Sequence, residues 1–348
     1  MKNRIGFSVL LALILSFVSA VLLLGACSGR GSNAPEASSG TVDNGYETFR
    51  IRIGHNNSTE HFIHQAAEAL AKKVGEATGG KVVFEIYPAE TIGTDREMAD
   101  AIVAGSGLDV FIGATGSFTQ HYTRLTFFEG PYVFESRQHL SNFYHSDFMQ
   151  KTLNAELAKN CNVQSIGQIY YGTRHVTSNK IARTPAEFKA LKIRAPKAEM
   201  IMDTVAAMGA AATPVEFSET YLALQQGVVD GQENPPASIA AMKFDEVQKY
   251  LILTGHIVQQ NHILLAEYTR RKASPKLLDL LLKTAEETGE EYMRISWGIE
   301  DNLLKELGKT MQIVEVDQSL FRAAMQPVYK KWIPVWGQDL MDAIAAAR

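Results

Sequence analysis

Cysteine is scarce in this chain. The 348 residues include only two, Cys27 and Cys161. Cys27 closes a predicted export signal, described below, so Cys161 has no partner and we expect no disulfide framework. Cys161 stands between Asn160 and Asn162 at a predicted helix-to-strand junction. We therefore interpret it as a small buried side chain rather than as a nucleophile.

Clusters of basic residues are also scarce. The formal net charge is −4, and the only basic run is the short Arg270-Arg271-Lys272. A protein that binds nucleic acid neutralises phosphates with a larger cluster of Lys and Arg. We therefore expect no nucleic-acid partner.

Catalytic and metal-binding motifs are missing. The chain has no Gly-x-Ser-x-Gly, no His-Glu-x-x-His and no Gly-x-x-x-x-Gly-Lys followed by Ser or Thr, which disfavours an exported hydrolase. His61, His64 and Glu68 recur at about one helical turn and could ligate zinc. A solvated polar face opposite the apolar stripe of Phe62 is the simpler interpretation. We predict a protein that is not an enzyme and has no metal or cofactor.

The N-terminal segment has the features of an export signal. Lys2 and Arg4 precede an apolar run over residues 5–24. The following Cys27, directly after Gly-Ala, matches a lipoprotein box, while a membrane-spanning anchor is the alternative. We predict a signal peptide at 1–26. Residues 27–46 are predicted to be a lipidated N-terminus and a flexible tether, because they are rich in Ser, Gly, Asn and Pro.

The rest of the chain alternates strand and helix patterns, which indicates an α/β fold. A long helical pattern between Ser274 and Leu307 would reach farther than one small lobe, so we expect it to tie two lobes together. Helices are predicted from Ser58 and at 96–103. Strands are predicted at 49–53, 81–87, 108–112, 163–170, 191–194, 212–215 and 228–232.

Arg194 is a candidate ligand-binding residue. It ends the predicted strand 191–194, and Pro196 keeps Ala195 extended. Open α/β sheets bind ligands in the crevice outside such strand ends. A guanidinium there can hold a carboxylate through two parallel hydrogen bonds. A surface salt bridge explains the segment alone equally well.

Phe217 and Asn234 are further candidates. Ser218 can cap a helix, which leaves Phe217 just outside the cap, where its ring could cover a ligand. Asn234 precedes Pro235, so it is expected to be extended and to offer a donor and an acceptor. Taken alone, Asn before Pro is usually a turn signal.

Several stretches together resemble the solute-binding proteins of TRAP (tripartite ATP-independent periplasmic) transporters, the DctP family. Shorter matches at 54–56, 86–88 and 130–132 extend the resemblance over the mature chain. The principal motifs are Tyr171-Gly172-Thr173-Arg174-His175-Val176-Thr177-Ser178, Lys192-Ile193-Arg194-Ala195-Pro196, Phe217-Ser218-Glu219-Thr220-Tyr221-Leu222-Ala223-Leu224-Gln225-Gln226-Gly227 and Asp230-Gly231-Gln232-Glu233-Asn234-Pro235.

The resemblance implies a set of ligand contacts. Arg194 matches the Arg that holds the substrate carboxylate in this family. Arg174, Asn234 and Asn56 match further contacts, and Phe217 matches an aromatic residue that packs on the ligand. We add His55, next to Asn56, as a hydrogen-bond donor to the ligand.

The resemblance also implies a two-lobe periplasmic-binding-protein-like (Venus flytrap) fold with a long helix spanning both lobes. We place lobe I at 47–171 plus 260–299, and lobe II at 172–259 plus 300–348. The expected protein is exported, anchored by lipid in the periplasm or at the cell surface, and monomeric. Its expected partners are a small organic acid and the sodium-driven membrane permease. A ligand sensor of the same fold is the alternative.

One stretch departs from the sialic acid binders of the family. Those proteins carry an acidic and a basic residue where this chain has the uncharged residues 112–117. We therefore expect a C4-dicarboxylate, a uronate or a related sugar acid as the ligand, rather than sialic acid.

Overall fold

The computed structural model describes residues 44–348. The predicted signal peptide, Cys27 and most of the predicted tether lie outside the described residues. Within residues 44–348, no helix is both long enough and apolar enough to cross a membrane.

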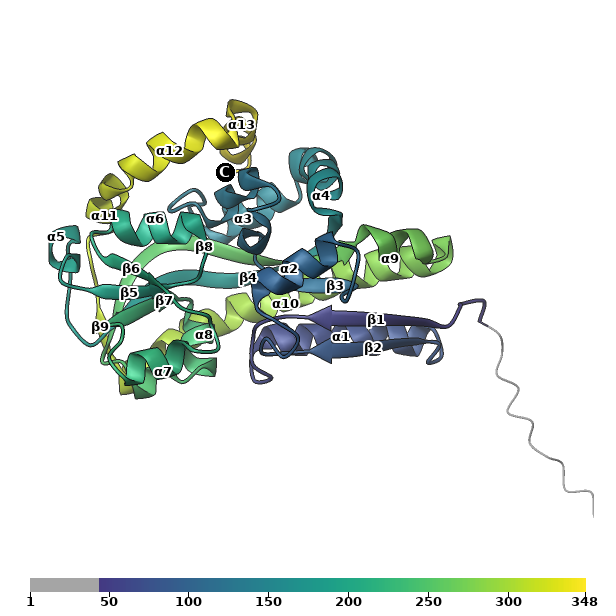
Figure 1. Ribbon diagram of the computed structural model, residues 1–348, viewed down its shortest axis with the longest axis horizontal. Coiled ribbons are helices and arrows are strands. Elements are labelled where there is room, and N and C mark those ends of the chain that lie inside the picture. Colours follow the sequence, from purple (N-terminus) through teal and green to yellow (C-terminus); the bar gives the residue numbers. More distant parts are fainter. Residues whose placement is uncertain (1–43) are drawn as a thin grey trace, which may run out of the picture. The chain divides into compact units, whose positions relative to one another are not determined.

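A mixed nine-stranded sheet organises the described chain (Figure 1). Its strands follow the order β2-β1-β3-β8-β4-β7-β5-β6, and β9 pairs with β8. Their bounds are β1 Phe49–Gly54, β2 Val82–Tyr87, β3 Val110–Gly113, β4 Val163–Ser178, β5 Lys192–Ala195, β6 Ala211–Pro214, β7 Gly231–Asn234, β8 Tyr250–Ala266 and β9 Gln312–Val314.

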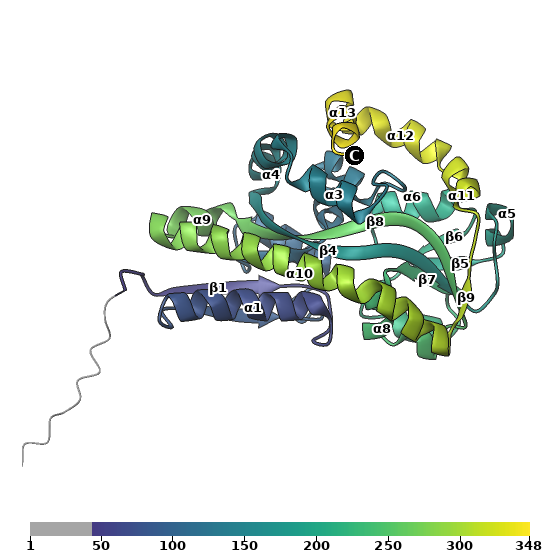
Figure 2. The ribbon, with the colours of Figure 1, turned by 180° about the vertical axis from the view of Figure 1, so that it is seen from behind.

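Helices pack on both faces of this sheet (Figures 1 and 2). The α-helices are α1 Phe62–Ala77, α2 Asp95–Val103, α3 Arg137–Tyr144, α4 Asn154–Cys161, α5 Pro185–Phe188, α6 Glu199–Ala207, α7 Thr220–Gln225, α8 Pro236–Ala241, α9 Glu267–Lys272, α10 Pro275–Thr310, α11 Gln318–Ala324, α12 Gln326–Trp336 and α13 Gln338–Ala346. Short 3₁₀ or π turns are η1 Thr115–Phe118, η2 Thr123–Glu129, η3 Phe148–Leu153 and η4 Phe244–Glu246.

Two long antiparallel strands, β4 and β8, join the two halves of the sheet. The first half consists of β2, β1 and β3, and β3 pairs with the end of β8 through Gly113 and His262. The second half consists of β7, β5 and β6, and β7 pairs with the end of β4 through His175 and Asn234. Each half contains parallel strands joined by helices, as the alternating pattern predicts.

Helix α10 extends along both halves (Figure 2). Ser274 caps it by accepting a hydrogen bond from the Leu277 N–H. The helix contacts α1, β4 and α8. Gly289 allows the close approach to β4, because a Cβ there would lie 2.6 Å from the Gln168 carbonyl oxygen. The predicted long helix is therefore confirmed.

Three local predictions are wrong. Helix α1 begins at Phe62 rather than after Ser58, because the His61 Nδ1 atom accepts a hydrogen bond from the Ile63 N–H and caps the helix. Ser218 does not cap α7, which begins at Thr220. The strand predicted at 228–232 lies at Gly231–Asn234, so Asn234 belongs to β7 itself.

Candidate functional site

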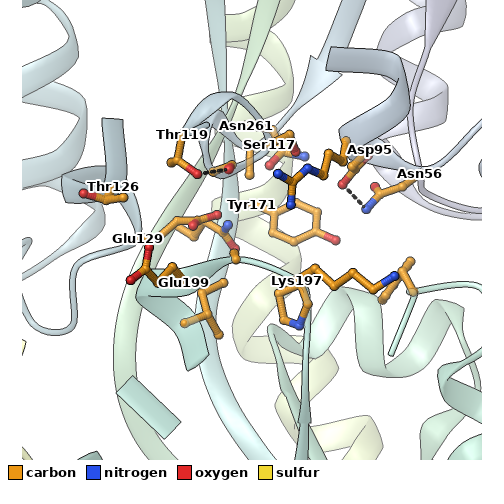
Figure 3. Close-up of a pocket in the computed structure, with 18 of the residues that line it drawn as sticks. Asn56, Asp95, Ser117, Thr119, Thr126, Glu129, Tyr171, Lys197, Glu199 and Asn261 are labelled. Atoms are coloured by element: carbon orange, nitrogen blue, oxygen red, sulfur yellow. Dashed lines mark hydrogen bonds between the residues drawn. The ribbon is translucent and has the colours of Figure 1, made fainter. Parts of the chain in front are cut away.

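A cavity of about 310 Å³ lies beside the long strands and is lined from both halves of the sheet (Figure 3). A ligand there would contact segments that are far apart in sequence. The lining residues that carry a charge or an amide are Asn56, Glu90, Asp95, Arg96, Gln120, Glu129, Arg174, Arg194, Lys197, Glu199, Glu216, Asn234, Gln259 and Asn261.

Arg194 presents an open guanidinium to this cavity. Its backbone is held in β5 between β6 and β7, and its side chain is 2% exposed. The Nε–H donates to the Val215 carbonyl oxygen at 2.9 Å. The two terminal nitrogens have no hydrogen-bond partner among residues 44–348. Burial lowers the pKa of Arg194 to about 10, so the side chain stays charged at neutral pH.

Arg174, on β4, differs from Arg194 because its charge is already compensated. Its Nε–H and one terminal N–H donate to the two Glu233 carboxylate oxygens at 2.5 and 2.6 Å. The other terminal nitrogen donates to Gln259 Oε1 at 2.6 Å. Burial alone would raise the pKa of Glu233, but the Arg174 charge and hydrogen bonds from His256 and Arg174 hold it at about 2.

Two asparagines line the cavity from opposite halves of the sheet. Asn234, at the end of β7, donates to Gln232 Oε1 at 2.5 Å. Asn56 follows β1 and donates to Asp95 Oδ2 at 2.7 Å, as the dashed line in Figure 3 marks. Asn57 donates in turn to Asn56 Oδ1 at 2.8 Å. These bonds fix the orientation of both amides.

Three aromatic side chains also line the cavity, namely Phe217, Tyr171 and Trp332. The Phe217 ring centre lies 5.7 Å from the Arg194 guanidinium carbon. Tyr171 extends into the middle of the view in Figure 3. Its hydroxyl donates to Asn57 Oδ1 at 3.0 Å and accepts from the Ser238 hydroxyl at 2.7 Å. All three side chains are almost fully buried and give the cavity apolar surface beside its charges.

Among the six predicted site residues, His55 is the one that the cavity does not include. Asn56, Arg174, Arg194, Phe217 and Asn234 all line it. His55 is fully buried, and a hydrogen bond of 3.1 Å joins its Nε2 to His64 Nδ1. Its backbone N–H donates to the Tyr87 carbonyl oxygen at the end of β2. His55 therefore supports the segment that carries Asn56.

The alternative zinc site is not assembled. The His61 ring caps α1, while His64 Nε2 lies 3.5 Å from Glu68 Oε1. Over residues 44–348, no group of three or more His, Cys, Asp or Glu side chains is arranged to hold a metal ion.

Sequence reasoning missed the acidic residues of the cavity. Burial raises the pKa of Glu90, and it raises the pKa of Asp95 well above its usual value. Burial also raises the pKa of Glu129 to about 7. Glu90 and Asp95 follow β2, so the rule on strand ends could have found them. Glu129 ends a 3₁₀ turn and carries no local signal.

Comparison with known proteins matches the chain to one family. Residues 53–334 match the family model of the bacterial extracellular solute-binding proteins, family 7 (DctP). The sialic acid-binding periplasmic protein of Vibrio cholerae is 33% identical over 297 residues, which cover 85% of this chain and 92% of that protein.

Solved structures agree with this match. A TRAP periplasmic solute-binding protein from Actinobacillus succinogenes with bound L-galactonate superposes with a TM-score of 0.80 at 26% identity, covering 86% of this chain and 98% of that one. A TRAP solute-binding protein from Sulfurospirillum deleyianum with bound succinate has a TM-score of 0.80 at 25% identity, covering 87% and 100%. These similarities confirm the predicted periplasmic-binding-protein fold with its long helix.

Proposed function

The chain belongs to the bacterial extracellular solute-binding proteins, family 7, and on that premise we propose that its cavity captures a small organic carboxylate for a TRAP membrane permease. The observation that carries this proposal is the Arg194 fork, buried and charged, with two terminal nitrogens that have no partner in the described chain. A carboxylate would satisfy both nitrogens with charge-assisted hydrogen bonds. Membership of this family confirms a binding protein rather than a hydrolase.

The proposed ligand contacts follow from the lining. Arg194 holds the carboxylate, and Phe217 covers it beside the guanidinium. Asn56 and Asn234 supply oriented amides to the rest of the ligand. Arg174 adds positive potential, but its bonds to Glu233 leave it less available than Arg194. His55 contributes by holding the segment of Asn56.

The test is a thermal-shift screen against a library of organic acids. Cys27→Ser protein, which cannot be lipidated, is the sample, because it retains every residue of the cavity. A ligand that binds only the folded state raises the melting temperature with its concentration. The proposal requires that carboxylates raise the melting temperature and that matched neutral amides or alcohols leave it unchanged. A library in which no carboxylate shifts the melting temperature contradicts the proposal.

We also propose the two lobes with the boundaries predicted from the sequence, 47–171 plus 260–299 and 172–259 plus 300–348. The two proposed lobes contact each other, since the Ser218 N–H of the second donates to Glu90 Oε2 of the first at 3.3 Å. The C-terminal helices contact both proposed lobes, since Arg124 donates to the Trp336 carbonyl oxygen and Lys331 pairs with Glu199. These contacts suit a hinge of limited amplitude.

The periplasmic location is that of the family, and the mode of attachment is a proposal. We infer that residues 1–26 are removed, that Cys27 is lipidated, and that the following segment tethers the folded body to a membrane. The support is the order of charged, apolar and small residues before Cys27.

A further inference from the structure

Glu129 is a buried carboxyl of the cavity wall that has no partner. Its side chain is 3% exposed, and neither carboxylate oxygen forms a hydrogen bond or an ion pair within residues 44–348. Buried polar groups are nearly always paired, so an orphaned carboxylate facing a cavity needs an explanation. In Figure 3 Glu129 lies on the opposite side of Tyr171 from Asp95 and Asn56.

The fold makes room for this carboxyl. Glu129 ends the 3₁₀ turn η2, and a Cβ on Gly116 of η1 would overlap its carboxylate oxygens. The missing side chain at position 116 therefore leaves space that the Glu129 carboxyl occupies. The lining residue Thr126 belongs to the same turn, but its hydroxyl donates to the Thr123 carbonyl oxygen and so does not satisfy Glu129.

Charges around the cavity are distributed unevenly. Arg174 pairs with Glu233, and Lys197 pairs with Glu216 at 2.5 Å. Arg96 is exposed and donates to Gln120. Among the described residues, Arg194 is thus the buried cation of the lining without a carboxylate partner. Glu129 is not among the partners of Arg194, whose Nε–H donates to the Val215 carbonyl oxygen.

We propose that Glu129 is a specificity-determining residue that accepts hydrogen bonds from hydroxyl groups of the ligand and thereby selects polyhydroxy monocarboxylates over dicarboxylates. This inference rests on the proposed function, because it assumes that Arg194 holds the ligand carboxylate. One open cation matches one carboxylate. A second carboxylate near Glu129 would meet an acid of the same sign, whereas a hydroxyl would satisfy the orphaned oxygens.

Matched pairs of acids test the inference. Galactonate and galactarate differ only in a terminal hydroxymethyl or carboxylate group, and the same holds for erythronate and meso-tartrate. Glucuronate and glucarate differ in a C1 aldehyde, closed to a hemiacetal, or a C1 carboxylate. Isothermal titration of the Cys27→Ser protein gives each affinity. In any pair that the protein binds, we expect the monocarboxylate to bind at least 10-fold more tightly than the dicarboxylate. A dicarboxylate that binds equally well overturns the inference but leaves the proposed function standing.

The role of Glu129 is isolated by Glu129→Gln, with Glu306→Gln as the control. Glu306 lies on α10 outside the cavity lining, is exposed, and pairs with Lys309 at 2.6 Å. Glu129→Gln should lower the affinity for the monocarboxylate by roughly 10- to 100-fold, the usual effect of losing a hydrogen bond to a charged group. It should also reduce the preference of the protein for the monocarboxylate over the dicarboxylate. Glu306→Gln should change neither the affinity nor the preference. An unchanged preference in a folded Glu129→Gln protein overturns the assignment.

Proton exchange on binding gives an independent readout. A ligand hydroxyl favours the ionised form of Glu129, so binding at pH 7 should release protons, and Glu129→Gln should reduce that release. The release is measured from binding enthalpies in buffers of different ionisation enthalpy. Proton uptake that depends on Glu129 overturns the inference, because it would mean that the carboxyl donates to an anion. Failure of all six acids to bind, when another carboxylate of the screen does bind, overturns the inference and leaves the proposed function standing.

Discussion

The guanidinium carbon of Arg194 lies 5.7 Å from the centre of the Phe217 ring, and both side chains are almost fully buried in the wall of one cavity. The guanidinium carbon lies over the ring, while the terminal nitrogens remain without partners in the described chain. This arrangement orients the fork before any ligand arrives, which reduces the entropy lost on binding.

Replacing Arg194 should therefore weaken binding without unfolding the protein. Arg194→Ala leaves a bound carboxylate buried without its partner, at a cost on the order of 2–5 kcal/mol, or roughly thirty to several thousand-fold in affinity. Arg194→Lys keeps the charge but cannot form the two parallel hydrogen bonds, so it should lose less affinity than Arg194→Ala. Isothermal titration with an acid identified in the screen measures both. Near wild-type affinity in a folded Arg194→Ala protein would remove Arg194 from its proposed role.

Arg174 should matter more for stability than Arg194. Its removal in Arg174→Ala leaves Glu233 buried beside His256 without its main partner. Breaking a buried pair in this way costs about 3–5 kcal/mol. Urea unfolding should show the loss. Lys151→Ala breaks the exposed pair with Asp147 and is the control, with an expected change below about 0.5 kcal/mol.

Stability should fall as the pH rises through the range in which Glu129 ionises. Its pKa rises from 4.5 to about 7 on folding, because burial and the nearby Glu233 outweigh the attraction of Arg174. Below about pH 4.5 the carboxyl is protonated in both states and carries no penalty. Above about pH 7 the penalty is complete, on the order of 3 kcal/mol.

Glu129→Gln should consequently raise the free energy of unfolding at pH 8 and have little effect at pH 4. Denaturant titrations of both proteins at the two pH values measure the difference. Glu90 and Asp95 also have raised pKa values, so the wild-type protein should lose stability over a wider range than Glu129 alone predicts. An equal effect of the substitution at both pH values would show that Glu129 does not ionise with a raised pKa.

Lipidation should depend on Cys27. Metabolic labelling with a fatty acid should mark the wild-type protein and not Cys27→Ser. Absence of label from the wild-type protein would refute the lipoprotein interpretation.

Ligand binding should close the proposed lobes. A charged ligand held between them gains from the exclusion of water, and β4 and β8 connect the two halves of the sheet. Small-angle scattering should show a smaller radius of gyration at saturating ligand. An unchanged radius would argue against the hinge.

The sequence by itself determined much of the element order and several ligand-site candidates. Apolar alternation and turn residues revealed the strands near 49–53 and 108–112, because each lies in a β-α-β order with local signals. Pro196 after Arg194, and Pro235 after Asn234, indicated extended backbone at both candidate residues. Such signals arise from the chain's own geometry and need no distant partner.

Tertiary structure alone decided the rest. Strand β8 was missed because buried polar side chains, including His256, Gln260 and His262, break its apolar pattern, and they are tolerated only through partners such as Glu233 and Ser165 from other strands. Glu129 was missed for the same reason, because its role also depends on contacts between distant segments. Its significance lies in the partner that it lacks and in the space left by Gly116, and both depend on segments that only folding brings together.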